Sequence, residues 1–66
     1  MIVYKKTDWG AYEMVVDGVV KYTIDYDSDR SVAYRWQAYS GTDILRGQVD
    51  AYKTLKDAKA SLEIYA

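Results

Sequence analysis

An Asp-Gly pair between two apolar runs is the feature of this sequence that most restricts its fold. The pair is Asp17-Gly18, and it lies between the apolar runs 14–16 and 19–20. Asp-Gly is the strongest short-range signal of a two-residue β-hairpin, because both turn positions require a positive φ that these residues tolerate. The sequence therefore predicts an antiparallel hairpin in which Val16 lies opposite Val19.

This register, continued along both predicted strands, divides the side chains of the hairpin between two faces. The face that we expect to lie in the core holds Ala11, Val15, Val20, Tyr22 and Ile24, with Glu13 as the exception. The other face holds Tyr12, Met14, Val16, Val19, Lys21 and Thr23. This second face is less polar than a solvent-exposed face usually is, so we expect a second copy, an N-terminal strand or a target protein to cover it.

The stretch 31–39 is predicted to be the central strand, because its residues alternate between two unlike sets. The set that we expect to face the core is Val32, Tyr34, Trp36 and Ala38. Trp36 is the largest apolar side chain in the middle of the chain, and large aromatic side chains dominate the burial of a small core. A loop at 27–29 would join this face to that of the hairpin, with Ile24 opposite Val32.

The other segments before the C-terminal part are typical of short strands and turns. Residues 2–6 are expected to form an edge strand, and Asp8-Trp9-Gly10 a turn. Residues 40–43 are also turn-forming, and 44–49 should return as another antiparallel strand. Its apolar residues cannot all share one face without a bulge, so the register of this strand stays open.

A C-terminal helix is predicted to begin at Thr54, a favourable N-cap that is followed three residues later by Asp57, as in a capping box. The apolar positions Leu55, Ala58, Leu62 and Tyr65 follow at helical spacing. We therefore expect one α+β domain over residues 1–66, an antiparallel meander of three to four strands with one C-terminal helix packed on one face. Its core would consist of Val20, Tyr22, Ile24, Val32, Tyr34, Trp36, Leu55, Ala58 and Leu62.

The residue types argue against enzyme and metal chemistry. Cysteine and histidine are absent, which removes the usual thiol nucleophile, general base and zinc ligands. The alternating aspartates of 25–30 resemble a calcium loop, but Arg30 occupies its sixth position, where glycine is needed, and Trp36 its twelfth, where glutamate is needed. We expect no enzymatic activity, no metal site and no cofactor.

Charge and size indicate the class of partner. The formal net charge is −1, whereas domains that hold nucleic acid by bulk electrostatics tend to be strongly basic. A chain of 66 residues without disulfides or metal ligands is expected to be modestly stable, which makes self-association as a homodimer a live alternative. The N-terminal residues contain no apolar run typical of a signal peptide or membrane span, so we expect a cytoplasmic protein without membrane contact.

Residues 22–64 resemble the small bacterial YegP-like domains. The matching pieces are Tyr22-Thr23-Ile24, Tyr34-Arg35-Trp36, Gly41, Ile44-Leu45, Tyr52 and Ala58. These are packing motifs, so the resemblance implies a fold of strands followed by a helix and transfers no active residues.

The run Thr54-Leu55-Lys56-Asp57-Ala58 is similar to the start of the helix in the arm-type DNA-binding domains of tyrosine integrases. That resemblance implies a sheet that enters the major groove, here through Lys21, Arg35, Gln37 and Tyr39. The aspartates of 25–29 would repel phosphates, which argues against this alternative.

We therefore expect a non-enzymatic interaction module that binds a protein partner through an exposed sheet face, with sheet-face DNA binding as the alternative. The expected partner-binding residues are Tyr12, Met14, Lys21, Arg35, Gln37 and Tyr39. Lys21 and Arg35 would lie opposite each other and form the electropositive centre of this surface. A small acidic chain rich in tyrosine and without cysteine is also typical of phage or mobile-element accessory proteins that inhibit a host protein.

Overall fold

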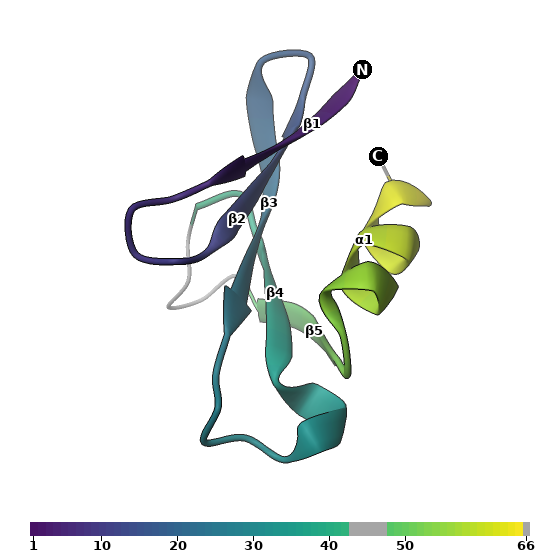
Figure 1. Ribbon diagram of the computed structural model, residues 1–66. Helices are drawn as coiled ribbons and strands as arrows, with labels where there is room; N and C mark the ends of the chain where they lie inside the picture. The colour runs from purple at the N-terminus through teal and green to yellow at the C-terminus, as the bar shows by residue number, and fades with distance from the viewer. Residues whose placement is uncertain (43–47, 66) are drawn as a thin grey trace.

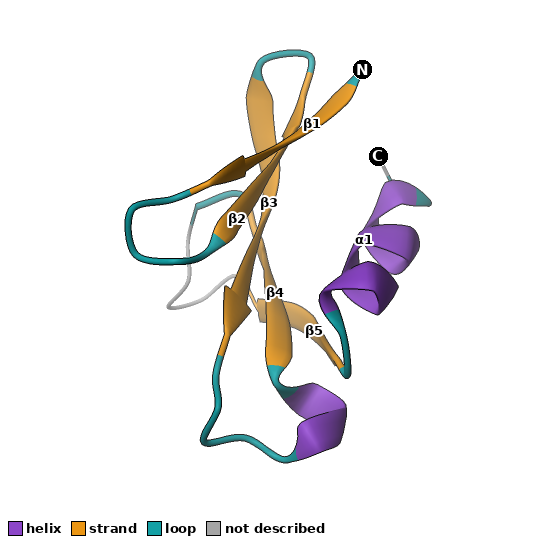
Figure 2. Ribbon diagram, viewed as in Figure 1, coloured by secondary structure: helices purple, strands orange, loops and turns teal. Residues whose placement is uncertain are grey.

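The computed structural model shows a five-stranded antiparallel sheet with one helix on one face (Figure 1). The structure describes residues 1–42 and 48–65. The elements are β1 (Ile2–Lys6), β2 (Tyr12–Val16), β3 (Val19–Tyr26), the short 3₁₀ helix η1 (Val32–Tyr34), β4 (Trp36–Ser40), β5 (Gln48–Tyr52) and α1 (Leu55–Glu63) (Figure 2). The strands follow one another in the sheet in chain order. The α+β meander is thus confirmed, with five strands in the described residues instead of three or four.

The predicted hairpin turn is confirmed. Asp17 has a φ of 51° and Gly18 a φ of 84°, as a two-residue turn with positive φ at both central positions requires. The residues next to the turn pair as expected, with Val16 opposite Val19. The edge strand 2–6 and the start of α1 at Thr54, whose hydroxyl accepts the Asp57 N–H at 3.0 Å, are also confirmed.

Further from the turn the predicted register is wrong, because the β2–β3 ladder contains a bulge. Met14 lies opposite Tyr22 instead of Lys21, and Lys21 is the extra residue of the bulge. A shift by one residue exchanges the faces of one strand relative to the other. Tyr12 and Met14 therefore join Tyr22 and Ile24 on the face that α1 covers.

The main core lies between this face and α1. Its buried members are Met14, Ile24, Ala38, Ala58 and Leu62. The side chains packed around them are Ile2, Tyr4, Tyr12, Val16, Tyr22, Trp36, Tyr52 and Leu55. The second apolar face of the hairpin is therefore covered by α1 of the same chain, which was not among the three predicted covers. Tyr65, the last residue of the predicted helical stripe, lies beyond α1 and is 70% exposed.

The predicted central strand 31–39 is only partly a strand. Its first half forms η1, where Val32 and Tyr34 are 54% and 57% exposed, so both are absent from the core. Ile24 consequently lies opposite Ala38 and not Val32. The observed partner of Ile24 is six residues further along the chain than the predicted one. Because this shift is an even number, the side chains keep their faces, and Trp36 lies on the predicted face.

The opposite face of the sheet also contains four buried residues. Ala11, Val15, Thr23 and Gln37 are buried there. The Thr23 hydroxyl donates to the Gly41 carbonyl at 2.6 Å, which ties the chain after β4 to this face. Val20 pairs with Val15 on this side, so its predicted place in the helix-covered core is wrong.

The predicted strand 44–49 can be compared with the structure only in part. Residues 44–47 of the predicted strand 44–49 lie outside the described residues, whereas Gln48 and Val49 belong to β5. No helix in residues 1–42 and 48–65 has the length and apolar character needed to cross a membrane.

Candidate functional site

The residues predicted to bind a partner do not share one surface. Met14 is buried in the core, and Tyr12 packs beneath α1 with its ring 6.3 Å from that of Trp36. Gln37 and Tyr39 lie on the opposite face of the sheet, where Gln37 is buried. The predicted face therefore cannot act as a single contact surface.

Lys21 and Arg35, the predicted electropositive centre, are not opposite each other. The Lys21 carbonyl accepts the Gly41 N–H at 2.7 Å, so Lys21 is aligned with the residue that follows β4. Arg35 directly precedes the first residue of β4, at the end of the strand opposite to Gly41. Its Nε donates to the Arg30 carbonyl at 3.1 Å. The predicted register is therefore wrong here, and the two cations lie at opposite ends of the β3–β4 pair.

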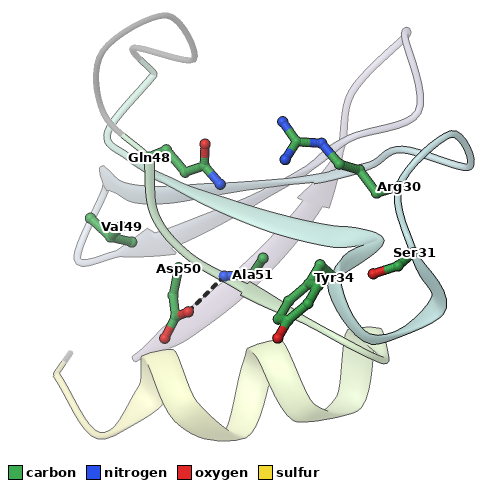
Figure 3. Close-up of a pocket in the computed structure, with 7 residues that line it drawn as sticks. All are labelled: Arg30, Ser31, Tyr34, Gln48, Val49, Asp50 and Ala51. Carbon is green, nitrogen blue, oxygen red and sulfur yellow. Dashed lines mark hydrogen bonds between the residues drawn. The ribbon is translucent and has the colours of Figure 1, made fainter.

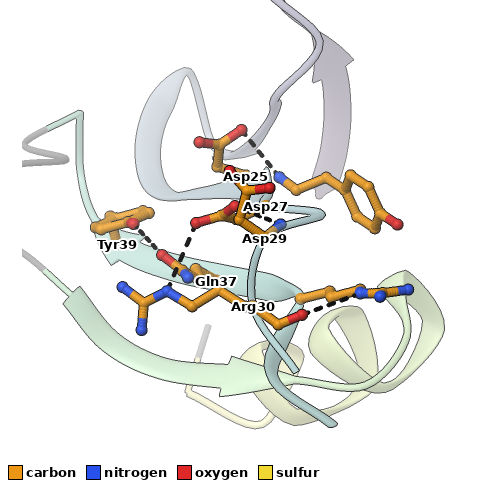
Figure 4. A network of polar contacts seen from close by, with 8 residues as sticks. Asp25, Asp27, Asp29, Arg30, Gln37 and Tyr39 are labelled. Atoms are coloured by element: carbon orange, nitrogen blue, oxygen red, sulfur yellow. Dashed lines mark hydrogen bonds and ion pairs between the residues drawn. The ribbon is translucent and has the colours of Figure 1, made fainter. Parts of the chain in front are cut away.

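A polar network on the face opposite α1 involves Gln37 and Tyr39 (Figure 4). The Tyr39 hydroxyl donates to the Gln37 side-chain oxygen, and the Gln37 side-chain nitrogen is buried without a partner in the described chain. Burial, followed by the negative charge of Asp25, raises the pKa of Tyr39, although nearby Arg30 opposes this effect. Asp27 accepts an ion-pair contact from Arg30 at 3.5 Å. The loop after β3 is joined to the chain before β4 by two other bonds, from the Asp27 N–H to the Arg35 carbonyl and from the Arg35 Nε to the Arg30 carbonyl.

Among the described residues, β5 pairs with β4 only, so its other edge has no neighbouring strand there. The backbone bonds from Asp27 to Arg35 at 2.8 Å and from Gly41 to Lys21 at 2.7 Å show which β4 residues face β3. The N–H and C=O groups of successive residues in an antiparallel strand point alternately to the two neighbouring strands. Gln37 is separated from residues 35 and 41 by an even number of positions, so its backbone groups also point to β3. Gln37 therefore forms a non-hydrogen-bonded pair with Ala51 on its other side. The N–H and C=O of Ala51 must then point away from β4, toward the free edge.

The Asp50 side chain supports this direction. Its Oδ1 accepts the Ala51 N–H at 2.8 Å (Figure 3). That donor is therefore used locally and not in the β4–β5 ladder. Asp50 itself lies opposite Ala38, on the face covered by α1. The carboxylate thus occupies the place where a neighbouring strand would accept a hydrogen bond.

Two hollows flank this edge on the two sides of the sheet. One, of about 550 Å³, is lined by Arg30, Ser31, Tyr34 and residues 48–51. The other, of about 260 Å³, is lined by Tyr22, Tyr52, Ser61, Leu62, Tyr65 and residues 49–50. Val49 is the extra residue of a bulge in the β4–β5 ladder, and with Asp50 it borders both hollows. Both sides of the edge are accordingly open to a ligand.

We call Arg30, Tyr34, Val49, Asp50 and Ala51 the β5 edge surface. Tyr34 is 57% and Val49 52% exposed, although large apolar and aromatic side chains are usually covered. The sequence did not indicate this surface, because the alternation of residues 31–39 assigned Tyr34 to the core. The position of the last strand of a meander, which has a neighbour on one side only, is the signal that could have indicated it.

In the described part of the chain, no three His, Cys, Asp or Glu residues cluster closely enough to hold a metal ion. Comparisons with protein-family models, curated proteins and solved structures give no match to this chain. The resemblances to YegP-like and integrase arm domains therefore stay predictions. What the fold defines is a small α+β meander domain whose sheet has edge strands at β1 and β5.

Proposed function

We propose that this domain is a non-enzymatic interaction module that binds a protein partner through the β5 edge surface. The observation that carries the proposal is the exposure of Tyr34 and Val49 beside a free sheet edge. Tyrosine and arginine are enriched where protein partners bind, because they combine a large contact area with a polar group. The composition favours a phage or mobile-element accessory protein as the identity of this chain. Its partner is then a cytoplasmic protein of the host, which the domain inhibits.

Arg30 is available to such a partner. Its only ion pair among the described residues is the 3.5 Å contact with Asp27, and both side chains are substantially exposed. An exposed ion pair of this kind contributes about 0–1 kcal/mol, so exchanging Asp27 for a partner group costs little. The guanidinium can therefore add a polar contact next to Tyr34.

Nucleic acid is the less favoured partner. Lys21 and Arg35 lie at opposite ends of the β3–β4 pair and do not form a cationic spot. The two hollows beside β5 share the acidic Asp50, and the net charge of the chain is −1. Phosphate binding requires an excess of cations, which this surface lacks.

Photo-cross-linking tests the proposal. A photoreactive amino acid replaces Tyr34 in one sample and Val19, which is 63% exposed at the hairpin, in the control. Both are incubated with nuclease-treated lysate of the source organism. We expect one protein to cross-link from position 34 only. The purified partner should then bind the Tyr34→Glu variant about tenfold or more weakly than it binds the wild type or Val19→Glu.

Two results would contradict the proposal. Equal cross-linking from positions 34 and 19 would show that the β5 edge surface has no special role. Recovery of nucleic acid from untreated lysate, lost at raised salt, would favour the DNA alternative.

A further inference from the structure

We propose that the free edge of β5 binds its partner by strand addition, and that the added strand carries Lys or Arg opposite Asp50 and an apolar or aromatic residue beside Tyr34. This inference rests on the proposed function and specifies the chemistry of the partner. Strand addition supplies affinity through backbone hydrogen bonds and specificity through pockets for alternate side chains.

The backbone requirement is met at Ala51. Its N–H and C=O point to the free edge, since Gln37 faces β3 and pairs with Ala51 without hydrogen bonds. An incoming strand would accept the Ala51 N–H and donate to its carbonyl, as in any antiparallel or parallel ladder. Ala51 is thus the residue at which strand addition would begin.

The side-chain requirement is met by the two hollows. Successive side chains of a strand point to opposite faces of a sheet. The partner residue opposite Ala51 would enter the hollow that contains Tyr34, whereas the residue opposite Asp50 would lie on the α1 side, near Ser61 and Tyr65. Ala51 is small, so the space beside Tyr34 is left for the side chain of the partner.

The charge of the partner follows from Asp50. In the free domain its carboxylate accepts the Ala51 N–H at 2.8 Å. Strand addition transfers that donor to the partner, which frees the exposed carboxylate to contact the side chain opposite it. A Lys or Arg at that position gains a charge-assisted hydrogen bond, whereas an acidic residue is repelled. Asp50 therefore selects a basic strand and discourages pairing with others.

A second copy of this chain is the competing occupant, because β1 offers the matching order Tyr4-Lys5 on the other free edge. Tyr4, however, packs beneath α1 of its own chain, where the ammonium of Lys59 lies 4.4 Å from the centre of its ring. It is not available to reach Tyr34 of another copy. A segment of a different protein is therefore the occupant to which the structure points.

A proline variant tests strand addition without removing a ladder bond. Proline is tolerated in edge strands where the N–H points outward, so Ala51→Pro should fold. The matched control is Lys6→Pro. Thr7 donates its N–H to Ala11 at 2.8 Å, so the neighbouring Lys6 N–H must point to the free edge of β1.

The probe is a phage-displayed library of random linear peptides, selected on the wild type. We expect enriched peptides to carry an apolar or aromatic residue next to Lys or Arg. Their affinity, measured by fluorescence polarisation, should fall about tenfold or more in Ala51→Pro, severalfold in Asp50→Asn, and less than about twofold in Lys6→Pro. In the wild type, peptide binding should slow hydrogen exchange of the Ala51 amide, a readout that needs no variant.

Several results would overturn the inference. These are the enrichment of no peptide, equal affinity for wild type and Ala51→Pro, or an Ala51 amide whose exchange the peptide leaves unchanged. Concentration-dependent association lost in both proline variants would make a second copy the occupant instead. A partner that cross-links at position 34 but binds Ala51→Pro as it binds the wild type would contradict strand addition and leave the proposed function intact.

Discussion

The ammonium of Lys59 lies over the ring of Tyr4, 4.4 Å from its centroid, and joins α1 to β1. The same ammonium is 5.7 Å from the centre of the Tyr12 ring. A cation above an aromatic ring is attracted by the negative face of the ring, by about 0.5–1 kcal/mol at partly exposed sites. Lys59 therefore links α1 to β1 and β2.

Replacement of Lys59 by Met should therefore lower the free energy of unfolding by about 0.5–1 kcal/mol. Met keeps most of the apolar length of the side chain and removes the charge. Lys56→Met is the control, because Lys56 is exposed on the same helix. Urea denaturation compares the two variants, and equal midpoints would contradict a role for the cation.

The titration of Tyr4 should make stability depend on alkaline pH. Burial, and after it the nearby Glu63 carboxylate, raises the pKa of Tyr4 from 10.0 to about 12. Between these values the unfolded chain has lost this proton and the folded chain still holds it, so the free energy of unfolding falls as pH rises. Tyr39, whose pKa is also raised, adds to the fall.

Tyr4→Phe removes one of these two groups. The decrease in the free energy of unfolding between pH 10 and pH 12 should be smaller in this variant than in the wild type. Below pH 10 the variant should be no less stable, since the Tyr4 hydroxyl is buried without a hydrogen-bond partner among the described residues. Denaturation curves at a series of pH values measure both effects, and parallel pH profiles would refute the assignment.

Met14 and Val19 share one face of the hairpin but differ in burial beneath α1. The predicted register places both on the outward face, whereas the structure buries Met14 fully and leaves Val19 63% exposed. Met14→Ala should lower the free energy of unfolding by about 2–5 kcal/mol, which approaches the total expected for so small a domain. Val19→Ala should change it by less than about 0.5 kcal/mol. Similar thermal midpoints for the two variants would contradict the burial of Met14 beneath α1.

The Tyr39–Gln37 hydrogen bond should be measurable by a double-mutant cycle. Tyr39→Phe leaves the buried Gln37 oxygen without its donor, which should cost about 1–3 kcal/mol. Replacing both residues, as Tyr39→Phe with Gln37→Met, removes donor and acceptor together and should cost less than the sum of the single changes. Strict additivity in thermal denaturation would show that the bond contributes nothing.

The β2–β3 bulge illustrates why the sequence did not predict the core. Both faces of the predicted hairpin are apolar, so the pattern of residues does not select one of them for burial. The bulge at Lys21 moves Met14 into the helix-covered core and leaves Val20 on the other side. The free energy that favours this arrangement comes from contacts with α1, which lies far away in the sequence.

The stretch 31–39 shows a related limit. Alternation of side chains does predict that Trp36 and Ala38 share a face, and the structure confirms it. It does not reveal that residues 32–34 leave the sheet as η1, where the Tyr34 N–H donates to the Ser31 carbonyl at 2.9 Å. The β5 edge surface depends on this departure, because Tyr34 reaches the edge only from η1.

Local sequence is sufficient to predict the turn at Asp17-Gly18, the N-cap at Thr54 and the order of strands and helix, since φ preferences and capping bonds act over a few neighbouring residues. It is not sufficient to predict which side of the hairpin is buried or which backbone groups face the outer edge of β5 at Ala51. Those outcomes depend on how distant segments pack, and the interactions that set them are absent from any short stretch of the chain.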